Sequence, residues 1–482
     1  MVTPRRAVLR DRRGDALRVW WDSIRVHRQG QAAVHDRQRE RLAELVAFAR
    51  GHSAFYRDLY RDLPDRVEDA SVLPVTDKRQ LMARFDEVVT DPAVTRAAVE
   101  EFVAEPGRIG ERFAGKYLVA TTAGTTGARG LFVLDDRYWA VMSGLMARLG
   151  ADWLSPAQLV QLMVRGGQFA GVVATGGHFL SVAAGTREKR EKPRRHRRLR
   201  IFPVHRPLPE LVAGLNLVQP VLLGSYASVL RLLATEQESG RLRLRPKLVL
   251  STAERLPPDE RVRVEHAFAA PVREVYGCTE SSYAAASCRE GWLHLIEDWV
   301  ILEPVDANYQ AVPPGMASHT VLMTNLANRV QPIIRYDVGD RLLVKPDVCA
   351  CGNPAPALLV EGRASDVLIF PTSDGKSRVA VPPLALGSTL DRTPGVGLFQ
   401  IVQTAPTRLS VRLLPEPGAD AHLVRAAVRD GIGNLLTGLG LAHVTVEPGE
   451  EPPRQSAGGK YRVMIPLAPT TGPAFPPPDE GT

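Results

Sequence analysis

The ten residues from Thr121 to Gly130 have a composition that suits the binding of a phosphate group. They read Thr-Thr-Ala-Gly-Thr-Thr-Gly-Ala-Arg-Gly and directly follow the apolar run 117–120. Glycine lets backbone N–H groups turn toward an anion, and threonine hydroxyls add further donors. A polar surface turn is the alternative for such a cluster taken alone. The stretch therefore predicts a phosphate-binding loop or a surface turn, and residues further along the chain decide between them.

A second stretch whose residues could take part in binding or catalysis is Glu-Val-Tyr-Gly-Cys-Thr-Glu, which spans Glu274 to Glu280. An apolar strand that ends in Tyr276 and Gly277 would offer an aromatic face on which a nucleobase can stack. Glu280 could hold Mg²⁺ there, because hard cations prefer oxygen ligands beside phosphates. A strand followed by an ordinary turn is the structural alternative.

Three later pieces add charged groups in similar surroundings. The segment 332–340 ends in Asp340, a carboxylate at a strand end that could accept both hydroxyls of a ribose. Arg363 follows the pair Glu-Gly, and Lys460 follows two glycines that would let a loop reach into an active site. Considered singly, each piece could equally be a salt bridge or a turn.

These pieces need a framework of helices and strands to position them. Residues 1–60 have apolar positions at helical spacing, and between about 115 and 345 short apolar runs alternate with helical stretches. Such alternation is typical of α/β layers around a largely parallel sheet. Beyond Gly362 the pattern changes to a smaller unit, with a β-like run at 410–414 and a helix around 420–438.

The composition is that of a folded, water-soluble globular protein of more than one domain. A chain of 482 residues is too long for one core, and its 44% apolar and 24% charged residues are ordinary for globular proteins. No apolar run reaches the roughly 18 residues of a membrane span, and the N-terminus lacks the apolar stretch of a signal peptide. We therefore expect a cytoplasmic protein with no membrane partner.

The formal net charge of +8 is concentrated in one segment. Residues 186–200 hold nine Lys or Arg and two Glu, a net +7, which leaves about +1 for the rest of the chain. Nucleic-acid-binding faces usually spread their cations and interleave aromatic residues, and this segment has no Phe, Tyr or Trp. We expect no nucleic-acid partner. A solvated basic loop and a contact for a phosphate ester or a carrier protein are the two interpretations that stay open.

Taken together and in this order, the five pieces resemble the adenylate-forming superfamily of acyl-CoA synthetases, in particular its phenylacetate-CoA ligase-like branch. That family has a Ser/Thr/Gly phosphate loop, then Tyr-Gly-x-Thr-Glu, Arg-Tyr-x-x-x-Asp, Gly-Arg and a late Gly-Lys. The resemblance spans about residues 40–465, and the stretches 223–228 and 251–254 agree with it as well.

The resemblance implies a fold and a reaction. We expect an α/β fold with a large N-terminal adenylation domain of layered mixed or parallel sheets (1–364). A small mobile α+β C-terminal lid (365–466) and a disordered tail (467–482) should follow, with the hinge at Ser365 or Asp366. In the implied reaction, a carboxylic acid, aromatic in the first instance, attacks ATP to give an acyl-adenylate and pyrophosphate. The acyl group then passes to CoA with release of AMP. A homodimer is one option for the assembly.

The family's roles can be carried over to matching positions. Lys460, Glu280 and Thr279 would be catalytic, with Lys460 bridging the substrate carboxylate and the α-phosphate and Glu280 holding Mg²⁺. The nucleotide-binding set comprises Thr121, Thr122, Gly124, Thr125, Thr126, Gly127, Ala253, Glu254, Tyr276, Gly277, Asp340 and Arg363. The acyl pocket would be lined by Tyr138, Trp139, Met142, Gly176, Gly177, His178 and Phe179.

Two departures from the family pattern leave the acceptor open. The phosphate loop has Ala123 and Ala128-Arg129 where hydroxyls, Pro or Lys are common. The family's glycine-rich turn that escorts pantetheine is replaced, in residues 367–380, by a charged version that keeps only Gly375. The acceptor could therefore be CoA, an amine, a carrier-protein thiol or another small nucleophile.

The cysteines and one histidine suggest a metal site. Cys288 and His294 follow the Tyr-Gly motif, and Cys349 and Cys351 form a Cys-x-Cys-Gly turn. Three thiolates and one imidazole complete a tetrahedral structural zinc site, and related ligases carry similar positions. Free reduced thiols are the alternative, because a disulfide is not expected in the cytoplasm. We interpret Cys278 as a small pocket-filling residue.

Two other functional classes also bind nucleotides or acyl ligands. A P-loop nucleotide hydrolase is excluded, because no Gly-x4-Gly-Lys-Ser/Thr sequence occurs. A non-catalytic relative that binds a nucleotide or an acyl ligand stays as an alternative. Its weakness is that the four charged residues Glu280, Asp340, Arg363 and Lys460 are all retained.

Overall fold

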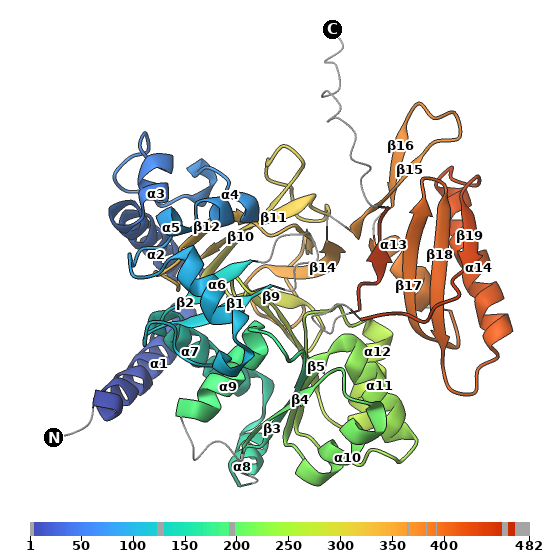
Figure 1. The fold of residues 1–482 in the computed structure, drawn as a ribbon, viewed down its shortest axis with the longest axis horizontal. Coiled ribbons are helices and arrows are strands. Elements are labelled where there is room, and N and C mark those ends of the chain that lie inside the picture. Colours follow the sequence, from blue (N-terminus) through green and yellow to red (C-terminus); the bar gives the residue numbers. More distant parts are fainter. Residues whose placement is uncertain are drawn as a thin grey trace. The chain divides into compact units, whose positions relative to one another are not determined.

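The computed structural model describes residues 4–122, 130–164, 166–191, 198–363, 366–381, 383–391, 393–455 and 461–467 (Figure 1). Contacts divide the chain into two compact units. The larger unit is Met1–Ala364 together with Gln455–Tyr461, and the smaller is Ser365–Arg454 together with Arg462–Thr482. The tail beyond 467, which we expect to be disordered, lies outside the described residues.

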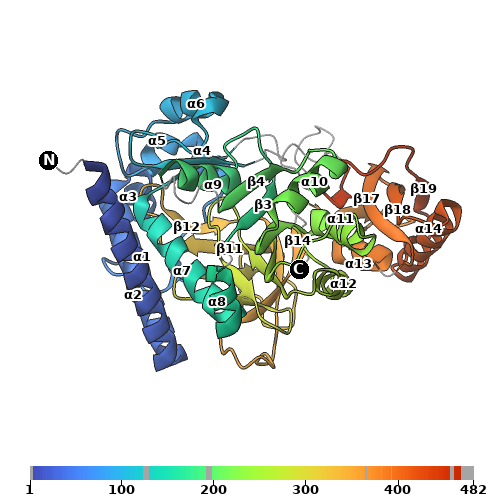
Figure 2. The same ribbon diagram turned by 90° about the horizontal axis from the view of Figure 1, so that it is seen from below.

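Long helices form the beginning of the larger unit, as the sequence predicts. The helices of this unit are α1 (Pro4–Gln29), α2 (Gln31–His52), α3 (Ala54–Leu59), α4 (Lys78–Ala83), α5 (Phe85–Val88), α6 (Arg96–Ala104), α7 (Asp136–Trp153), α8 (Pro156–Val164), α9 (Leu180–Glu191), α10 (Leu208–Val218), α11 (Ala227–Glu238) and α12 (Pro258–Phe268). Helix α1 packs along α7 (Figure 2), where a Cβ at Gly144 would lie 2.8 Å from Val19. Glycine at this position therefore permits the close approach of the two helices.

The strands that the structure describes in the larger unit form three sheets. They are β1 (Leu118–Thr121), β2 (Leu131–Leu134), β3 (Phe169–Val173), β4 (Leu199–Pro203), β5 (Leu222–Tyr226), β6 (Leu248–Thr252), β7 (Val272–Tyr276), β8 (Ala285–Ser287), β9 (Leu293–Leu295), β10 (Val300–Val305), β11 (Thr320–Asn325), β12 (Ile333–Asp337), β13 (Asp340–Val344) and β14 (Ala357–Arg363). Strands β1 and β2 pair with each other, and β10, β11 and β12 form a second sheet.

The third sheet has nine strands in the order β13-β14-β9-β8-β7-β6-β5-β3-β4. Strands β4, β3, β5, β6 and β7 run parallel, and the pairs from β7 through β8, β9 and β14 to β13 are antiparallel. The expected mixed α/β fold is thus confirmed. The parallel part is covered by α10, α11 and α12, whose apolar residues form one core with those strands (Figure 1). The carboxyl ends of parallel strands share one edge, so the residues after β6 and β7 are brought together.

The smaller unit has its own core. Its elements are β15 (Leu368–Pro371), β16 (Arg378–Val381), α13 (Pro383–Asp391), β17 (Val396–Ala405), β18 (Arg408–Pro415), α14 (Ala421–Gly438), β19 (Thr445–Pro448) and β20 (Met464–Ile465). The side chain of Asp420 caps α14, which buries Val424, Val428, Ile432 and Leu436 at four-residue spacing. The predicted strand at 410–414 and helix at 420–438 are therefore confirmed, within β18 and α14.

The described part of the basic segment 186–200 is folded, which differs from one of its two interpretations, a solvated loop. Residues up to Glu191 belong to α9, and Arg187 is buried, with its guanidinium bound to Asp136 at 2.8 Å and to Glu191 at 3.0 Å. Arg190 pairs with Glu111 at 2.7 Å. Part of the segment's charge is therefore neutralised inside the fold, and residues 192–197 lie outside the described part of the chain. Among the helices that the structure describes, none is both long and apolar enough to cross a membrane.

Candidate active site

Three of the predicted nucleotide-binding residues meet at the ends of strands β7, β13 and β14. The hydroxyl of Tyr276 donates to Asp340 Oδ2 at 2.9 Å, and Arg363 Nε donates to Asp340 Oδ1 at 3.1 Å. Asp340 is buried, and it pairs with Arg363 across the β13–β14 ladder. The structure thus brings an aromatic ring, a carboxylate and a guanidinium from three strands into one cluster, as the strand-end positions in the sequence suggested.

The loop after β7 is tightly folded around Gly277. A Cβ at this position would lie only 2.1 Å from the carbonyl oxygen of Ser282, so no other residue fits without a backbone shift. Cys278 N donates to Ser281 O at 2.9 Å, and Ser282 N donates to the hydroxyl of Tyr138 at 2.8 Å. This close packing fixes the direction in which the following residues leave the strand.

Glu280 is held in place by groups from the neighbouring sheet. Its carboxylate oxygen Oε1 accepts from the hydroxyl of Tyr336 at 2.9 Å, and its carbonyl oxygen accepts from Asn325 Nδ2 at 2.8 Å. Burial, followed by the nearby charges of Glu280 and Asp340, raises the pKa of the Cys278 thiol well above its usual range. The thiol is therefore protonated at neutral pH, which agrees with a filling role and not with that of a nucleophile.

Lys78, which no sequence motif indicated, contacts the neck of the Thr/Gly loop, formed by Thr122 and Gly130. Thr122 N donates to Gly130 O at 3.1 Å, and Gly130 N donates to Thr122 Oγ1 at 2.9 Å, so the two ends of the loop are closed against each other. Lys78 Nζ donates to the same Thr122 Oγ1 at 3.1 Å. Burial lowers the pKa of the Lys78 ammonium, while nearby Glu280 raises it and Arg363 lowers it. Lys78 is thus a cation of this site that comes from the N-terminal region.

Glu254 takes part in contacts that the sequence did not reveal. It follows Ala253, whose φ of +69° is rare for a residue other than glycine. Glu254 Oε2 accepts from Ser228 N near the start of α11 at 2.9 Å, and Oε1 accepts from Tyr461 N at 2.8 Å. The structure therefore shows Glu254 bonded to two backbone N–H groups, one of them directly after Lys460 in the sequence.

The large apolar residues predicted for the acyl pocket belong to two different packing groups. Tyr138 and Met142 are buried in the core around β1, β2 and α7, and Trp139 packs against it. Phe179 packs against the core beneath α10–α12. His178 is buried, and its ring lies 5.4 Å from that of Phe102. These packing groups do not define a substrate pocket, so the assignment of the seven residues stays a prediction.

Several predicted residues cannot be compared with the structure. Gly124, Thr125, Thr126, Gly127 and Lys460 lie outside the described residues, as do the irregular positions Ala123, Ala128 and Arg129. Ser365, one of the two predicted hinge residues, is also outside, whereas the other, Asp366, accepts from Arg462 Nε at 2.8 Å within the smaller unit. The described site thus consists of the neck of the loop and the groups that surround it.

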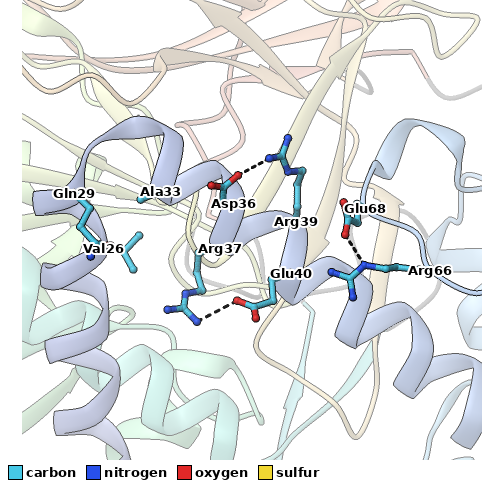
Figure 3. A pocket seen from close by; sticks show the side chains of 9 residues that line it. All are labelled: Val26, Gln29, Ala33, Asp36, Arg37, Arg39, Glu40, Arg66 and Glu68. Carbon is cyan, nitrogen blue, oxygen red and sulfur yellow. Dashed lines mark hydrogen bonds and ion pairs between the residues drawn. The ribbon is translucent and has the colours of Figure 1, made fainter.

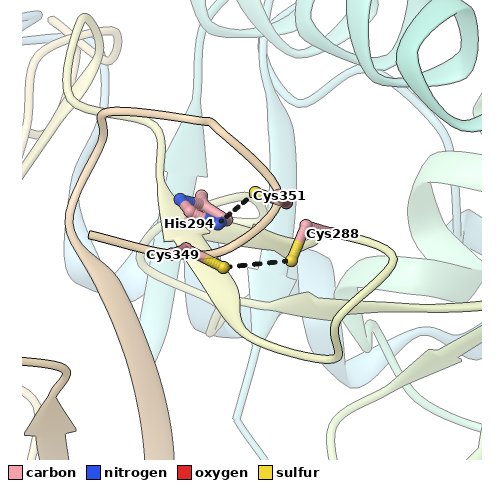
Figure 4. A group of neighbouring side chains, drawn as sticks. All are labelled: Cys288, His294, Cys349 and Cys351. Carbon is pink, nitrogen blue, oxygen red and sulfur yellow. Dashed lines mark hydrogen bonds between the residues drawn. The ribbon is translucent and has the colours of Figure 1, made fainter. Parts of the chain in front are cut away.

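The predicted metal ligands come together (Figure 4). The ligand atoms of Cys288, His294, Cys349 and Cys351 all lie within 4.8 Å of one another. The sulfur atoms of Cys288 and Cys349 are 3.8 Å apart, and Cys351 Sγ lies 3.2 Å from His294 Nε2. A disulfide has a sulfur–sulfur distance of about 2.05 Å, whereas a tetrahedral zinc with Zn–S bonds of about 2.3 Å has sulfur–sulfur edges of about 3.8 Å.

Groups around the cluster orient its ligands. His294 Nδ1 lies 2.9 Å from Ala355 O, a bond that leaves Nε2 to face the sulfur atoms, and Asn353 N donates to Cys351 Sγ at 3.4 Å. Cys288 and His294 come from the β8–β9 hairpin, and the other two cysteines come from the β13–β14 connection. The cluster therefore joins two parts of the antiparallel half of the large sheet, which also carries Asp340 and Arg363.

Glu274, inside β7, should make the stability of the protein depend on pH. Burial raises the pKa of Glu274 to about 7, although Leu256 N donates to it. Since an unfolded chain loses this proton near pH 4.3, the folded chain binds more protons between about pH 4.3 and 7, and stability falls as the pH rises through this range. We expect Glu274→Gln to match the wild type at low pH and to melt several degrees higher at pH 8, because a loss of about 3 kcal/mol is avoided.

Melting curves at pH 5 and pH 8 check this prediction. Asp430→Asn is the control, because that carboxylate is 67% exposed and should leave the pH dependence unchanged. An equal melting temperature of Glu274→Gln and wild type at pH 8 would show that ionisation of Glu274 does not lower the free energy of unfolding.

A surface hollow of about 430 Å³ lies apart from these residues (Figure 3). It is lined by Val26, Gln29, Ala33, Asp36, Arg37, Arg39, Glu40, Arg66 and Glu68. Its charged groups form ion pairs with one another, namely Arg37 with Glu40, Arg39 with Asp36 and Arg66 with Glu68. None of the residues with predicted chemistry lines it, so we do not assign it a catalytic role.

Comparisons with known proteins support the fold of the chain. No protein-family model and no curated protein matches the sequence. A structure of 2-hydroxyisobutyryl-CoA ligase in the postadenylation state, in complex with 2-HIB-AMP, is similar with a TM-score of 0.65 and 20% identity, over 91% of this chain and 90% of that chain. An open conformation of the same ligase with 2-HIB-AMP and CoA gives a TM-score of 0.53 and 20% identity, over 92% and 90%. The phenylacetate-CoA ligase-like branch stays a prediction. The chain therefore has the fold of the adenylate-forming CoA ligases.

Proposed function

We propose that this protein is an ATP-dependent ligase, which activates a carboxylic acid as an acyl-adenylate with release of pyrophosphate and then transfers the acyl group to CoA with release of AMP. One observation carries the proposal. Tyr276, Asp340 and Arg363 converge at the strand ends, while Lys78 reaches the neck of the Thr/Gly loop beside Glu280. In this proposal, Tyr276 would offer an aromatic face to the base, Asp340 and Arg363 would bind the ribose, and Lys78 would supply a cation for the phosphates.

In the proposed reaction, these residues hold ATP and stabilise the charge that develops on its phosphates. Asp340 would accept the ribose hydroxyls, with its carboxylate oriented by Tyr276 and Arg363, and the Thr/Gly loop would donate to the phosphates. Lys78 and Lys460 would supply positive charge, which is most effective when it is already in place before the reaction. Glu280, kept in position by Tyr336, is suited to hold Mg²⁺, which would neutralise phosphate charge.

The acid and the acceptor are the parts that need experiment. We propose an aromatic acid as the first candidate, on the basis of the aromatic residues in the predicted acyl pocket. An amine or a carrier-protein thiol is the alternative acceptor. This alternative is favoured by the turn of the β15–β16 hairpin, because the family's turn at this place is rich in glycine and escorts pantetheine. Here the turn carries the charged residues Asp374 and Lys376 and has Gly375 as its sole glycine.

An assay of pyrophosphate release with ATP and a panel of aromatic and aliphatic acids tests the proposal. We expect at least one acid to stimulate release, and mass spectrometry with and without CoA should then show an acyl-CoA. Release that needs acid but yields no acyl-CoA would favour the alternative acceptors. ATP binding without pyrophosphate release for any acid would favour the non-catalytic alternative.

We also propose that Cys288, His294, Cys349 and Cys351 hold one structural zinc ion. The spacing of their ligand atoms supports this assignment, and the metal would join the β8–β9 hairpin to the β13–β14 connection. Metal analysis should give one zinc per chain, and Cys351→Ser should lose most of it. Because metal binding contributes to folding, removal by a chelator should lower the melting temperature by roughly 5–10 °C.

Cys278→Ser is the matched control for the zinc site, because Cys278 is a cysteine outside the cluster and should leave the zinc content unchanged. A wild-type protein that binds no zinc when it is purified from zinc-supplemented cells would contradict the assignment and would favour free thiols.

A further inference from the structure

The segment that carries Lys78 is fastened to the edge of β12. Thr76 N donates to Arg335 O at 3.0 Å, and Thr76 Oγ1 donates to Ile334 O at 2.9 Å. In the opposite direction, Asp337 N donates to Thr76 O at 2.8 Å. These three bonds fix the chain two residues before Lys78, which begins α4.

The strand has an unusual backbone at this point of attachment. The ladder between β11 and β12 shifts register, so that Ile334 and Arg335 lie opposite the single residue Thr324. Arg335 has a φ of +46°, in the left-handed region that such bulges usually fill with glycine. Its N–H is satisfied by Thr324 Oγ1 at 2.9 Å. An arginine in a strained conformation suggests that its side chain has a task there.

The side chain of Arg335 reaches the same segment a second time. Its Nε donates to Glu303 Oε1 at 3.2 Å, and its Nη1 donates to the carbonyl oxygen of Leu73. Both charged side chains are largely buried, with 13% of Arg335 and 17% of Glu303 exposed. Arg335 therefore holds the segment at Leu73 through its side chain and at Thr76 through its backbone.

We propose that Arg335 is a positioning residue, which sets Lys78 against Thr122 at the neck of the Thr/Gly loop. The bulge determines where residues 73–76 are bonded to β12, and these residues determine where α4 begins. The next residue in the strand, Tyr336, binds Glu280, so one short stretch of β12 positions both a cation and a carboxylate of the site. The inference rests on the proposed function, because it assigns Lys78 to the binding of ATP phosphates.

A double-mutant cycle on acid-dependent pyrophosphate exchange tests this coupling. We expect Arg335→Ala to lower kcat roughly tenfold with little change in the KM for the acid, and to have less than about a twofold effect when Lys78 is already alanine. If Arg335→Ala lowered kcat by the same factor in the presence and in the absence of Lys78, the proposal would be overturned, because Arg335 would then act independently of the lysine.

Two further variants separate positioning from loss of stability. Arg231→Ala is the matched control, since Arg231 is 12% exposed and pairs with Glu260 at 3.2 Å, and the two residues lie on α11 and α12, whereas Lys78 lies on α4. Its effect should be small and equal in both backgrounds. Arg335→Lys keeps a cation beside Glu303 but lacks the second guanidinium nitrogen that donates to Leu73 O. The variant should therefore retain the fold and still lower kcat. Full activity of a folded Arg335→Lys together with full activity of Arg335→Ala would contradict the proposal.

A readout without acid or ATP keeps this inference distinct from the proposed function. Trace labelling of amines with isotopic acetic anhydride, read by mass spectrometry on the peptide that contains Lys78, gives the pH at which this lysine becomes reactive. The groups that face Lys78 are Thr122, Glu280 and Arg363. We expect the midpoint to shift toward the ordinary lysine value of about 10.4 in Arg335→Ala, and to stay unchanged in Arg231→Ala. An unchanged midpoint in Arg335→Ala would overturn the positioning role even if no acid is ever activated.

Discussion

We expect Lys460→Ala to lower the rate of acyl-adenylate formation by roughly 100-fold or more while the protein stays folded. A lysine that bridges the substrate carboxylate and the α-phosphate stabilises negative charge where it increases in the transition state. Its removal therefore lowers kcat more than it weakens ATP binding. Acid-dependent exchange of pyrophosphate into ATP measures this step alone, because it does not need an acceptor.

The control for this variant is Arg429→Ala, which removes a cation that is 62% exposed on α14 of the smaller unit. It should exchange pyrophosphate at the wild-type rate. Wild-type exchange by Lys460→Ala would remove Lys460 from the reaction and, with it, the strongest link between the late Gly-Gly-Lys stretch and the site.

The second large effect is expected for Lys78→Met. Methionine keeps an unbranched stem against Gly130, whereas the charge and its bond to Thr122 are lost. If Lys78 supports the phosphate-binding loop, the exchange rate should fall roughly 30- to 100-fold, as for the loss of one preorganised donor. The KM for ATP should rise as well, because an ammonium near the phosphates binds the ground state too.

Arg79→Ala provides the comparison, because Arg79 is the exposed neighbour of Lys78 on α4. It should behave as wild type. If Lys78→Met and Arg79→Ala exchange pyrophosphate equally fast, the bond to Thr122 is a structural contact only, and the cationic side of the site must come from other residues.

The sequence predicted much of this architecture because its signals are local. The apolar runs at β5, β6 and β7 end in polar residues, and parallel strands place such ends at one edge. The meeting of Tyr276 with Asp340 and Arg363 does not follow from this rule, because Asp340 and Arg363 lie on the antiparallel strands β13 and β14. The order of the motifs indicated it. The cysteine spacing likewise anticipated the cluster of Cys288, His294, Cys349 and Cys351.

Other features depend on contacts between distant residues, for which the sequence has no local signal. Lys78 lies in an ordinary Thr-Asp-Lys start of a short helix, and only its attachment to β12 brings it to the loop. The buried position of Arg187 is similar, because a run of basic residues suggests a solvated surface until partners such as Asp136 are known. A bulge with arginine in the left-handed region also contradicts the usual preference for glycine.

The order in which the candidate site can form during synthesis follows from where its residues lie in the sequence. Lys78 comes early in the chain, Thr122 follows β1, Tyr276 ends β7, and Arg363 ends β14. A nascent chain therefore has no complete candidate site until β14 has left the ribosome, whatever parts of the N-terminal helices and the parallel strands have already folded. Since so many of its contacts join distant segments, the larger unit should fold slowly, and ATP should bind only to chains that extend beyond β14.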